Sequence, residues 1–412
     1  FAYTQLINTR PVALPRKTTS FKAWSEQLGE WAASEAINTE LDYWQQLPWD
    51  DAGMLPLDHS DGDNSEANTQ LHTLELSAEK TSGIMQGLAN RYRVSPRDIL
   101  LSAVATAISE STDNNTVIID LEGHGREDLF DGTDLSRSVG WFTTLYPVVL
   151  QLPADKSATN TLPAVRDQIA ALPNKGIGFG VLRYLAPDTI LSAPTAEVSF
   201  NYLGVIDQVA SDNSMFSVLN EPRGPEHSLA NARPHKLDIN CMVSDGRLYM
   251  NFGFSKKIFA ESTIAALAGR VEAALDSLIS IGDSGASLRS SPAAFPLADL
   301  NQNELDKLLQ ENESVEDIYP LTPLQQGMLF HSLLDTSTDV YFASFNWLLE
   351  GRIDIDKFQE AWNLVINQHS SLRSATHWQG LRTPMQVVQQ SVVMPFTFDD
   401  WSGIGSAEQD AK

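Results

Sequence analysis

The chain has 412 residues, of which 42% are hydrophobic and 20% charged. This is the balance of a globular protein with a buried core and room for two or three domains. Lys and Arg total 28 against 53 Asp and Glu, so the net charge is -25. No basic cluster forms a track for phosphates, which excludes nucleic acid as a partner. The acidic excess itself names no ligand, because a diffuse negative surface is usually a solubility feature.

Cysteine usage and the chain ends indicate the setting of the protein. Cys241 is the single cysteine, so no internal disulfide can form, which favours a reducing, cytoplasmic setting. No apolar run approaches the ~20 residues that span a bilayer, and the first residues (FAYTQLINTR) lack the apolar core of a signal peptide. We therefore expect no membrane partner. The chain begins without an initiator Met and stops in a polar stretch, so we expect both ends to be cuts.

Hydrophobic periodicity predicts a mixture of helices and strands in the first part of the chain. Ser95, Pro96 and Asp98 start one helix, because Ser caps free amides, Pro suits the first helical position and Asp favours the positive end of the dipole. Asp245 and Gly246 predict a hairpin turn between two apolar runs. The predicted elements are, in chain order, one long helix or two shorter ones (21–47), a loop (50–69), a strand (71–77), a helix from about Ala78, a buried helix from Ser95, two strands (116–120 and 146–152), a helix (about 164–171), three strands (196–202, 236–243 and 247–254) and a helix (261–279).

A second unit is predicted to follow a connection between domains. Residues 282–296 are small, polar and Pro-containing, as expected of a flexible connection. Asn301 and Glu304 form a capping-box pattern for a short helix. A new unit then begins, with elements predicted as a helix starting at Thr322 and Pro323, a strand (341–349), a helix (356–368) and further strands. The mixture of elements in both units indicates an α/β or α+β class.

The strand at 116–120 leads into a loop that reads LEGHGREDLF (121–130). Its two glycines permit a tight turn that presents Glu122 and His124 at the end of the strand. A carboxylate beside a His and an Arg is a candidate general acid/base, because burial and a nearby cation shift its pKa in opposite directions. Taken alone, so short a motif is better explained as a solvated turn with a local ion pair.

The motifs that follow this loop change its interpretation. They are, in order, SVGWFTTLYPVVL (138–150), PNKGIGFG (173–180), FNYLG (200–204) and RPHKLDINCMVSDGRLYMNFGFS (233–255). Together with EGHGRE they resemble the ordered signature motifs of the epimerization domains of nonribosomal peptide synthetases, over about residues 1–281. Phe179 stands where the family tends to have Tyr, and Val205 where it often has a polar residue. In the second unit, YPLTPLQQGMLFHSLL (319–334) and HSSLRS (369–374) resemble the first two motifs of a condensation domain.

This resemblance implies a two-lobed fold like that of chloramphenicol acetyltransferase, with one lobe largely complete and a partial lobe of a second such domain. The family's His-His-x-x-x-Asp-Gly motif is absent, because none of the 8 histidines has a histidine neighbour. The implied division is an epimerization domain without most of its N-terminal lobe (1–281), an interdomain linker (282–315) and the N-terminal part of a condensation domain (316–412). The fragment by itself is therefore expected to be inactive.

The resemblance also implies the reaction and the residues that perform it. The family inverts the α-carbon of an aminoacyl or peptidyl thioester held on the phosphopantetheine of a carrier protein, beside adenylation and condensation domains of the same chain. Glu122 is then one catalytic acid/base, and the second is a His of the missing motif. His124, Tyr146, Asn201 and Tyr202 are candidate substrate-binding residues, of which Tyr146 and Asn201 are candidates to stabilise an enolate. For Asn201 and Tyr202, simple strand packing explains the residues equally well.

Two rival functions remain, and two cofactor classes are not expected. A free-standing acyltransferase of the same fold using coenzyme A gives no reason for EGHGRE, and a non-catalytic docking platform between carrier domains is the other alternative. Gly176, Gly178 and Gly180 imitate a phosphate-cradling loop, but no Lys-Ser/Thr follows them. The histidines lack metal-ligand spacing. We therefore expect no directly bound cofactor and no metal.

Overall fold

The computed structural model describes residues 2–186, 191, 193–206, 224, 227–284, 288–312, 314–334, 341, 343–347, 349–405 and 408. The chain divides into two compact units, Phe1–Arg289 and Ser290–Lys412. In the described ranges, no helix combines the length and the apolar character needed to cross a bilayer.

The first unit is built on a six-stranded mixed sheet in the order β1-β6-β5-β4-β2-β3. Its strands are β1 (Thr69–Glu75), β2 (Thr116–Gly123), β3 (Thr144–Gln151), β4 (Val198–Val205), β5 (Leu237–Ser244) and β6 (Arg247–Ser255). The pairs β2–β4 and β4–β5 are parallel, and the other pairs are antiparallel. β2 pairs with β3 along its whole length, but with β4 only at Asp120↔Ser199 and Leu121↔Phe200.

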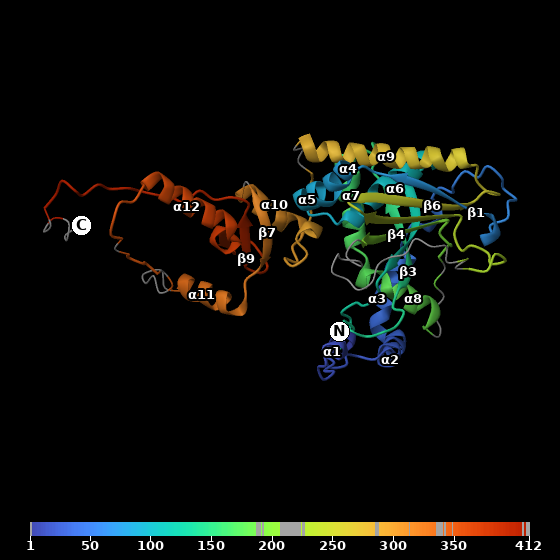
Figure 1. Cartoon of the computed structure of the whole chain (residues 1–412), viewed down its shortest axis with the longest axis horizontal. Coiled ribbons are helices and arrows are strands. Elements are labelled where there is room, and N and C mark those ends of the chain that lie inside the picture. The colour runs from blue at the N-terminus through green and yellow to red at the C-terminus, as the bar shows by residue number, and fades with distance from the viewer. Residues whose placement is uncertain are drawn as a thin grey trace. The chain divides into compact units, whose positions relative to one another are not determined.

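Helices cover one side of this sheet and gather near β3. Figure 1 shows α9 along one side, with α4, α6 and α7 between it and the strands, whereas α3 and α8 lie toward β3. The helical segments are α1 (Ala2–Ile7), α2 (Phe21–Ala32), α3 (Asn38–Gln45), α4 (Ala78–Ser82), the π-helical turn η4 (Gly83–Leu88), α5 (Ala89–Tyr92), α6 (Pro96–Thr112), α7 (Ala158–Ala170), α8 (Ile177–Tyr184) and α9 (Glu261–Ser284).

The core lies between α6, α9 and one face of the sheet. α6 begins as its sequence predicts, because the Ser95 hydroxyl accepts a hydrogen bond of 3.1 Å from the amide of Asp98. Alternate strand residues point to opposite faces of a sheet. The core face carries apolar residues that are almost completely buried, among them Leu121, Phe200, Ile239 and Phe252. The opposite face is polar, and strand register places Glu122, Asn201, Asn240 and Asn251 on it.

Most predicted elements of the first unit are confirmed. The segment 21–47 forms the pair of helices α2 and α3, and the hairpin of β5 and β6 turns at Asp245 and Gly246, both with positive φ. The helix predicted at about 164–171 begins earlier, at Ala158, because buried Pro163 is accommodated inside α7 rather than ahead of it. Helix α8 was not predicted, since its Gly-rich start resembles a loop.

The second unit has a small sheet with its own core. Its strands are β7 (Val315–Pro320), β8 (Ser374–His377) and β9 (Met385–Gln389) in the order β7-β9-β8, and its helices are α10 (Gln302–Glu311), α11 (Pro323–Leu334) and α12 (Ile355–Gln368). The predicted capping box of α10 is confirmed, because the side chains of Asn301 and Glu304 each accept from the other's backbone amide. Leu305 and Leu308 of α10 are buried with Ile318, Met385 and Val387.

The structure bears on two predictions for this region. The strand predicted at 341–349 is wrong, because its described residues form no strand, and the β7-β9-β8 sheet provides no described partner for one. The residues predicted as a linker, 282–315, include the end of α9 and all of α10. Residues 285–287 and 313 of that segment lie outside the described residues. The division into an epimerization and a condensation domain stays a prediction.

Replacing Leu101 by Ala tests the core. The Leu101 side chain is fully buried in α6 against the sheet, so a cavity should lower the free energy of unfolding of the first unit by about 2–5 kcal/mol. Chemical denaturation followed by tryptophan fluorescence measures this. Leu71→Ala is the matched control, because Leu71 on β1 is 60% exposed. Equal losses for the two variants would contradict this core.

Candidate active site

Glu122 lies near the end of β2 on the polar face of the sheet. Its carboxylate accepts a hydrogen bond of 2.8 Å from the side-chain amide of Asn201 on β4. The parallel register of Asp120 with Ser199 brings these two side chains together one step beyond the last paired residues. Partial desolvation and the negative charge of Asp238 raise the pKa of Glu122, whereas the positive charge of His235 works in the other direction. Glu122 is therefore an accessible carboxylate with the tunable proton affinity of a general base.

The loop after β2 is a tight turn held against β3. Gly125 has φ +65°, and a Cβ there would lie 1.6 Å from the carbonyl oxygen of Phe142. The Arg126 guanidinium lies 4.1 Å from the centre of the Phe142 ring and donates to the carbonyl of Leu135. This packing fixes the loop that follows Glu122 and carries His124. Of the two glycines from which the turn was predicted, Gly125 has a positive φ, whereas Gly123 is the last residue of β2.

His124 points into a surface ion pair rather than to Glu122. Its Nε2 lies 3.4 Å from Glu127, and Lys175 lies 2.9 Å from the other oxygen of the same carboxylate. Its Nδ1 accepts from the amide of Arg126. The local ion pair that explains this motif in isolation is therefore present beside His124, and the structure shows no contact between His124 and Glu122 among the interactions of the described residues.

Tyr146 and Tyr202 lie on the core face, away from Glu122. Tyr146 is opposite Leu121 on β3, so its side chain is buried between the sheet and α6. The hydroxyl of Tyr202 lies 3.4 Å from the sulfur of Met85 on the helix side. Adjacent residues of a strand point to opposite faces, so Tyr146, opposite Leu121, lies on the other face of the sheet from Glu122. The role of Tyr146 in stabilising an enolate stays a prediction. Of the predicted substrate-binding residues, Asn201 alone has a contact with Glu122 among the described interactions.

Sequence reasoning missed a charged cluster beside Glu122 on the same face. His235 Nε2 lies 2.8 Å from Asp120, and its Nδ1 lies 3.3 Å from Asp238. The other Asp238 oxygen lies 2.5 Å from the Arg233 guanidinium, and Ser199 donates to Asp238 at 2.6 Å. The available signal was the spacing of Arg233, His235 and Asp238 at the start of β5 in RPHKLD, a motif that was noted without roles for its residues.

The electrostatics of this cluster favour a charged imidazole. Burial alone would lower the pKa of His235, but hydrogen bonds to Asp120 and Asp238 raise it to about 9. Burial raises the pKa of Asp238, but bonds from His235, Ser199 and Arg233 outweigh it and hold that pKa below its usual range. At neutral pH the cluster therefore holds an imidazolium between two carboxylates.

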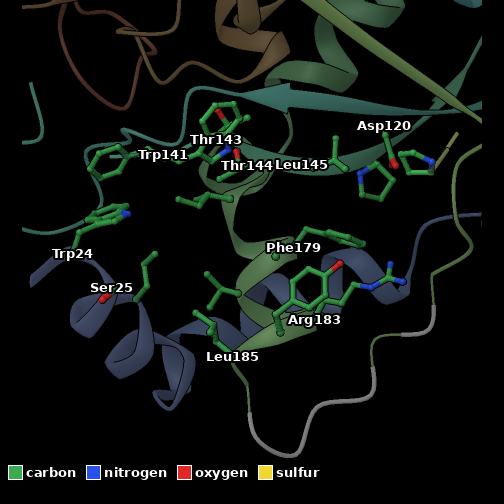
Figure 2. Close-up of a pocket in the computed structure, with 18 of the residues that line it drawn as sticks. Trp24, Ser25, Asp120, Trp141, Thr143, Thr144, Leu145, Phe179, Arg183 and Leu185 are labelled. Carbon is green, nitrogen blue, oxygen red and sulfur yellow. The ribbon is translucent and has the colours of Figure 1, made fainter. Parts of the chain in front are cut away.

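A cavity of about 530 Å³ adjoins the cluster. Figure 2 shows Asp120 at the opposite end of this cavity from Trp24 and Trp141. Phe142, Phe179 and Leu145 add apolar wall, and His235 lines the cavity together with Asp120. Leu145 is the β3 partner of Glu122, so the cavity borders the strand positions that carry the carboxylates. An apolar pocket with few polar groups at one end is the usual form of a small-molecule site.

Two structural observations concern the sequence features considered for metal and nucleotide binding. No group of three or more His, Cys, Asp or Glu within them is placed to hold a metal ion. Gly176, which imitated a phosphate loop, has φ +86°, and a Cβ there would lie 2.4 Å from the ring of Tyr146. Close packing against Tyr146 therefore explains why Gly176 is a glycine.

Comparison with known proteins identifies the family. The family model "Condensation domain" matches residues 1–290 and 315–412. The chain therefore belongs to the condensation-domain superfamily of nonribosomal peptide synthetases. Its fold resembles that of the epimerization domain from the third module of tyrocidine synthetase B, with a TM-score of 0.63 and 31% identity, covering 68% of this chain and 64% of that one.

Similar curated proteins are much longer. The chain is 42% identical over 398 residues to a linear gramicidin synthase subunit of Brevibacillus parabrevis, covering 95% of this chain and 5% of that protein. It is 32% identical over 392 residues to a mycosubtilin synthase subunit of Bacillus subtilis, covering 94% of this chain and 15% of that protein. The chain thus spans a small fraction of the synthetases that it matches.

Gly125→Ala should distort the loop that follows Glu122 and destabilise the first unit. A Cβ at a positive φ costs about 1–2 kcal/mol, and the clash with the Phe142 carbonyl adds about 1–3 kcal/mol. Gly132→Ala is the matched control, because Gly132 also has positive φ but has nothing within 4 Å of the added Cβ. Urea unfolding of both variants measures the difference, and equal losses would show that the loop is not packed as described.

The charged His235 should make stability depend on pH. Because its pKa is raised in the folded state to about 9, its stabilising contribution is complete below about pH 6.5 and is lost as the pH rises through 9. The loss should be at most roughly 3 kcal/mol, since one pKa unit corresponds to about 1.4 kcal/mol and solvent screening reduces the effect. His235→Gln should abolish this alkaline loss and His72→Gln should retain it, as measured by urea unfolding from pH 6 to 10. An unchanged loss in His235→Gln would refute the ion-paired imidazolium.

Proposed function

We propose that the first unit is the larger part of an epimerization domain that inverts the α-carbon of an aminoacyl or peptidyl thioester, with Glu122 as one of the two acid/base groups. The observation that carries this proposal is the Glu122 carboxylate, held by Asn201 on the open polar face and raised in pKa. The likeness to the tyrocidine epimerization domain supports the same assignment.

The chemistry suits a carboxylate in this position. A thioester acidifies the neighbouring α-proton, so a general base must remove that proton on one face and an acid must return one on the other. Glu122 accepts the proton as its carboxylate becomes a carboxylic acid, and the pair of electrons passes to the thioester oxygen as an enolate. The side-chain amide of Asn201, which donates to Glu122, is proposed as a donor to that charge.

The second acid/base group is proposed to come from outside this chain. Inversion requires groups on both sides of the α-carbon, and the polar face presents Glu122 from one side only. The solved relative includes a further third of a domain that this chain does not cover. The substrate is proposed to arrive on the phosphopantetheine of a carrier protein, with adenylation and condensation domains as neighbours in the same synthetase, as the much longer relatives suggest.

The second unit is proposed to be the start of a condensation domain. The family model resumes at residue 315, where β7 begins, within the unit that starts at Ser290. Helices α11 and α12 have no buried residues, and Leu324, Phe330 and Leu364 are each more than half exposed. Apolar helix faces of this kind require more protein to cover them. This supports a unit that is completed by sequence beyond this chain.

The alternatives are less well supported. A free-standing acyltransferase using coenzyme A gives no role to the Glu122–Asn201 pair, and the chain covers 5% of the synthetase to which it is 42% identical. A docking platform requires no tuned carboxylate beside an apolar cavity. Both fail if the parent synthetase exchanges the substrate α-proton for deuterium in a manner that depends on Glu122.

Glu122→Gln in the full-length synthetase should slow epimerization by roughly 100-fold or more, because Gln retains the shape but cannot accept the proton. The measurement is the rate at which the D-isomer and solvent deuterium appear in the residue on the carrier protein, with circular dichroism as the folding control.

Glu79→Gln is the matched control, since Glu79 is an exposed carboxylate on α4, on the helix side of the sheet. Its rate should equal that of the parent. A folded Glu122→Gln variant that epimerizes at the parent rate would make Glu122 a structural residue and remove the basis of the proposal.

A further inference from the structure

The cluster of His235, Asp120, Asp238 and Arg233 is unusual because all of its members except Asp238 are nearly buried and yet lie on the polar face that carries Glu122. His235 and Arg233 are 5% and 6% exposed, and Asp120 is 9% exposed. Charges removed from water are costly unless each is paired. Here every member has a partner, through the contacts of His235 with both carboxylates and of Arg233 with Asp238 and the carbonyl of Gly253.

The cluster is close enough to Glu122 to act on its charge. Asp120 and Glu122 are two residues apart on β2 and point to the same face, so their Cα atoms are about 6.7 Å apart. Asp238 points to the same face from β5, next to Ser199, which is two residues before Asn201 on β4. Another cation near the Asp120–His235 end is Arg183 of α8, which lines the same cavity.

The charges of the cluster balance as it stands. Two carboxylates, Asp120 and Asp238, face one imidazolium and one guanidinium, and each cation contacts at least one of the carboxylates. Without the charge of His235, the face that carries Glu122 would hold one uncompensated negative charge. A nearby like charge disfavours the ionised form of a carboxylic acid, and the charges of Asp238 and His235 act on Glu122 in opposite directions. Only an ionised Glu122 can remove a proton.

We propose that His235 is a positioning residue for the reaction of Glu122: its positive charge, held between Asp120 and Asp238, balances the two carboxylates that share the face with Glu122 and so keeps Glu122 ionised at neutral pH. His235 does not touch the substrate in this assignment, because both of its nitrogens are engaged by the carboxylates. The inference rests on the proposed role of Glu122 and adds to it the residue that sets the proton affinity of the base.

The test is the pH dependence of kcat/KM for epimerization by the full-length synthetase, whose acidic limb reports the ionisation of the base. His235→Gln leaves a negative excess and should move this limb to higher pH by about one unit. Asp120→Asn leaves a positive excess and should move the limb to lower pH. The double variant, which is neutral again, should bring the limb back to within about 0.3 units of the parent.

This reversal separates charge balance from a structural role. A merely structural residue would lower kcat/KM at all pH values, and its loss would be deepened rather than reversed by a second substitution. The control is His72→Gln on β1. The strand order places β1 about 19 Å from β2, the strand of Glu122, so this variant should leave the acidic limb at the pH of the parent. The proposal is overturned if the acidic limb of kcat/KM does not move in either single variant. It is also overturned if the limb of the double variant lies at the same pH as that of His235→Gln. If His235→Gln does not fold, the shift of the acidic limb to lower pH in Asp120→Asn still tests the proposal, and an unmoved limb there overturns it.

A second measurement does not depend on activity. Carbon NMR titration of the Glu122 carboxyl in the 412-residue chain, assigned by its loss in Glu122→Gln, should show the same order of shifts in the single and double variants. Shifts in this titration together with a synthetase that does not epimerize would refute the proposed function but retain the inference. Epimerization with an unshifted Glu122 titration would refute the inference alone.

Discussion

The central sheet depends on one constraint, the alternation of side chains along each strand. Every strand of the first unit gives one set of residues to a core closed by α6 and α9, and the other set to a face that the helices of that core do not cover. On β2 the alternation separates Leu121, which is buried, from Glu122, which is exposed. Apolar burial therefore fixes which residues can perform chemistry, because a shift of the register by one residue would exchange the two faces.

The charged groups on the polar face together determine how far the pKa of Glu122 is raised. Low solvation raises the pKa of a carboxylic acid, and nearby carboxylates such as Asp120 and Asp238 raise it further. Together the two effects favour the protonated form, which cannot act as a base. His235 and Arg233 enter from the start of β5 and supply the compensating charges. Asp120, Arg233 and His235 are each less than a tenth exposed, and low exposure to water strengthens their interactions relative to those in bulk solvent.

Local signals predicted the parts of the fold that depend on neighbouring residues. The cap of α6 at Ser95, the capping box at Asn301 and the hairpin turn at Asp245 all follow from short patterns. The faces of β3 and β4 did not follow from a motif, so the sequence could not show that Tyr146 and Tyr202 lie on the core face, opposite to the face of Glu122. The pairing of His235 with Asp120 joins residues 115 positions apart, and only the strand order β5-β4-β2 brings them together.

The short pairing of β2 with β4 has a mechanical consequence. Backbone bonding between these parallel strands is limited to two residue pairs, so the sheet is least firmly joined along this line. Side chains reinforce the seam, through Asn201 to Glu122 and through His235 to Asp120. A hydrogen bond to an ionised carboxylate is roughly twice as strong as one to a neutral acid. Protonation of Glu122 therefore weakens the hydrogen bond from Asn201 that joins β2 to β4, and deprotonation strengthens it again.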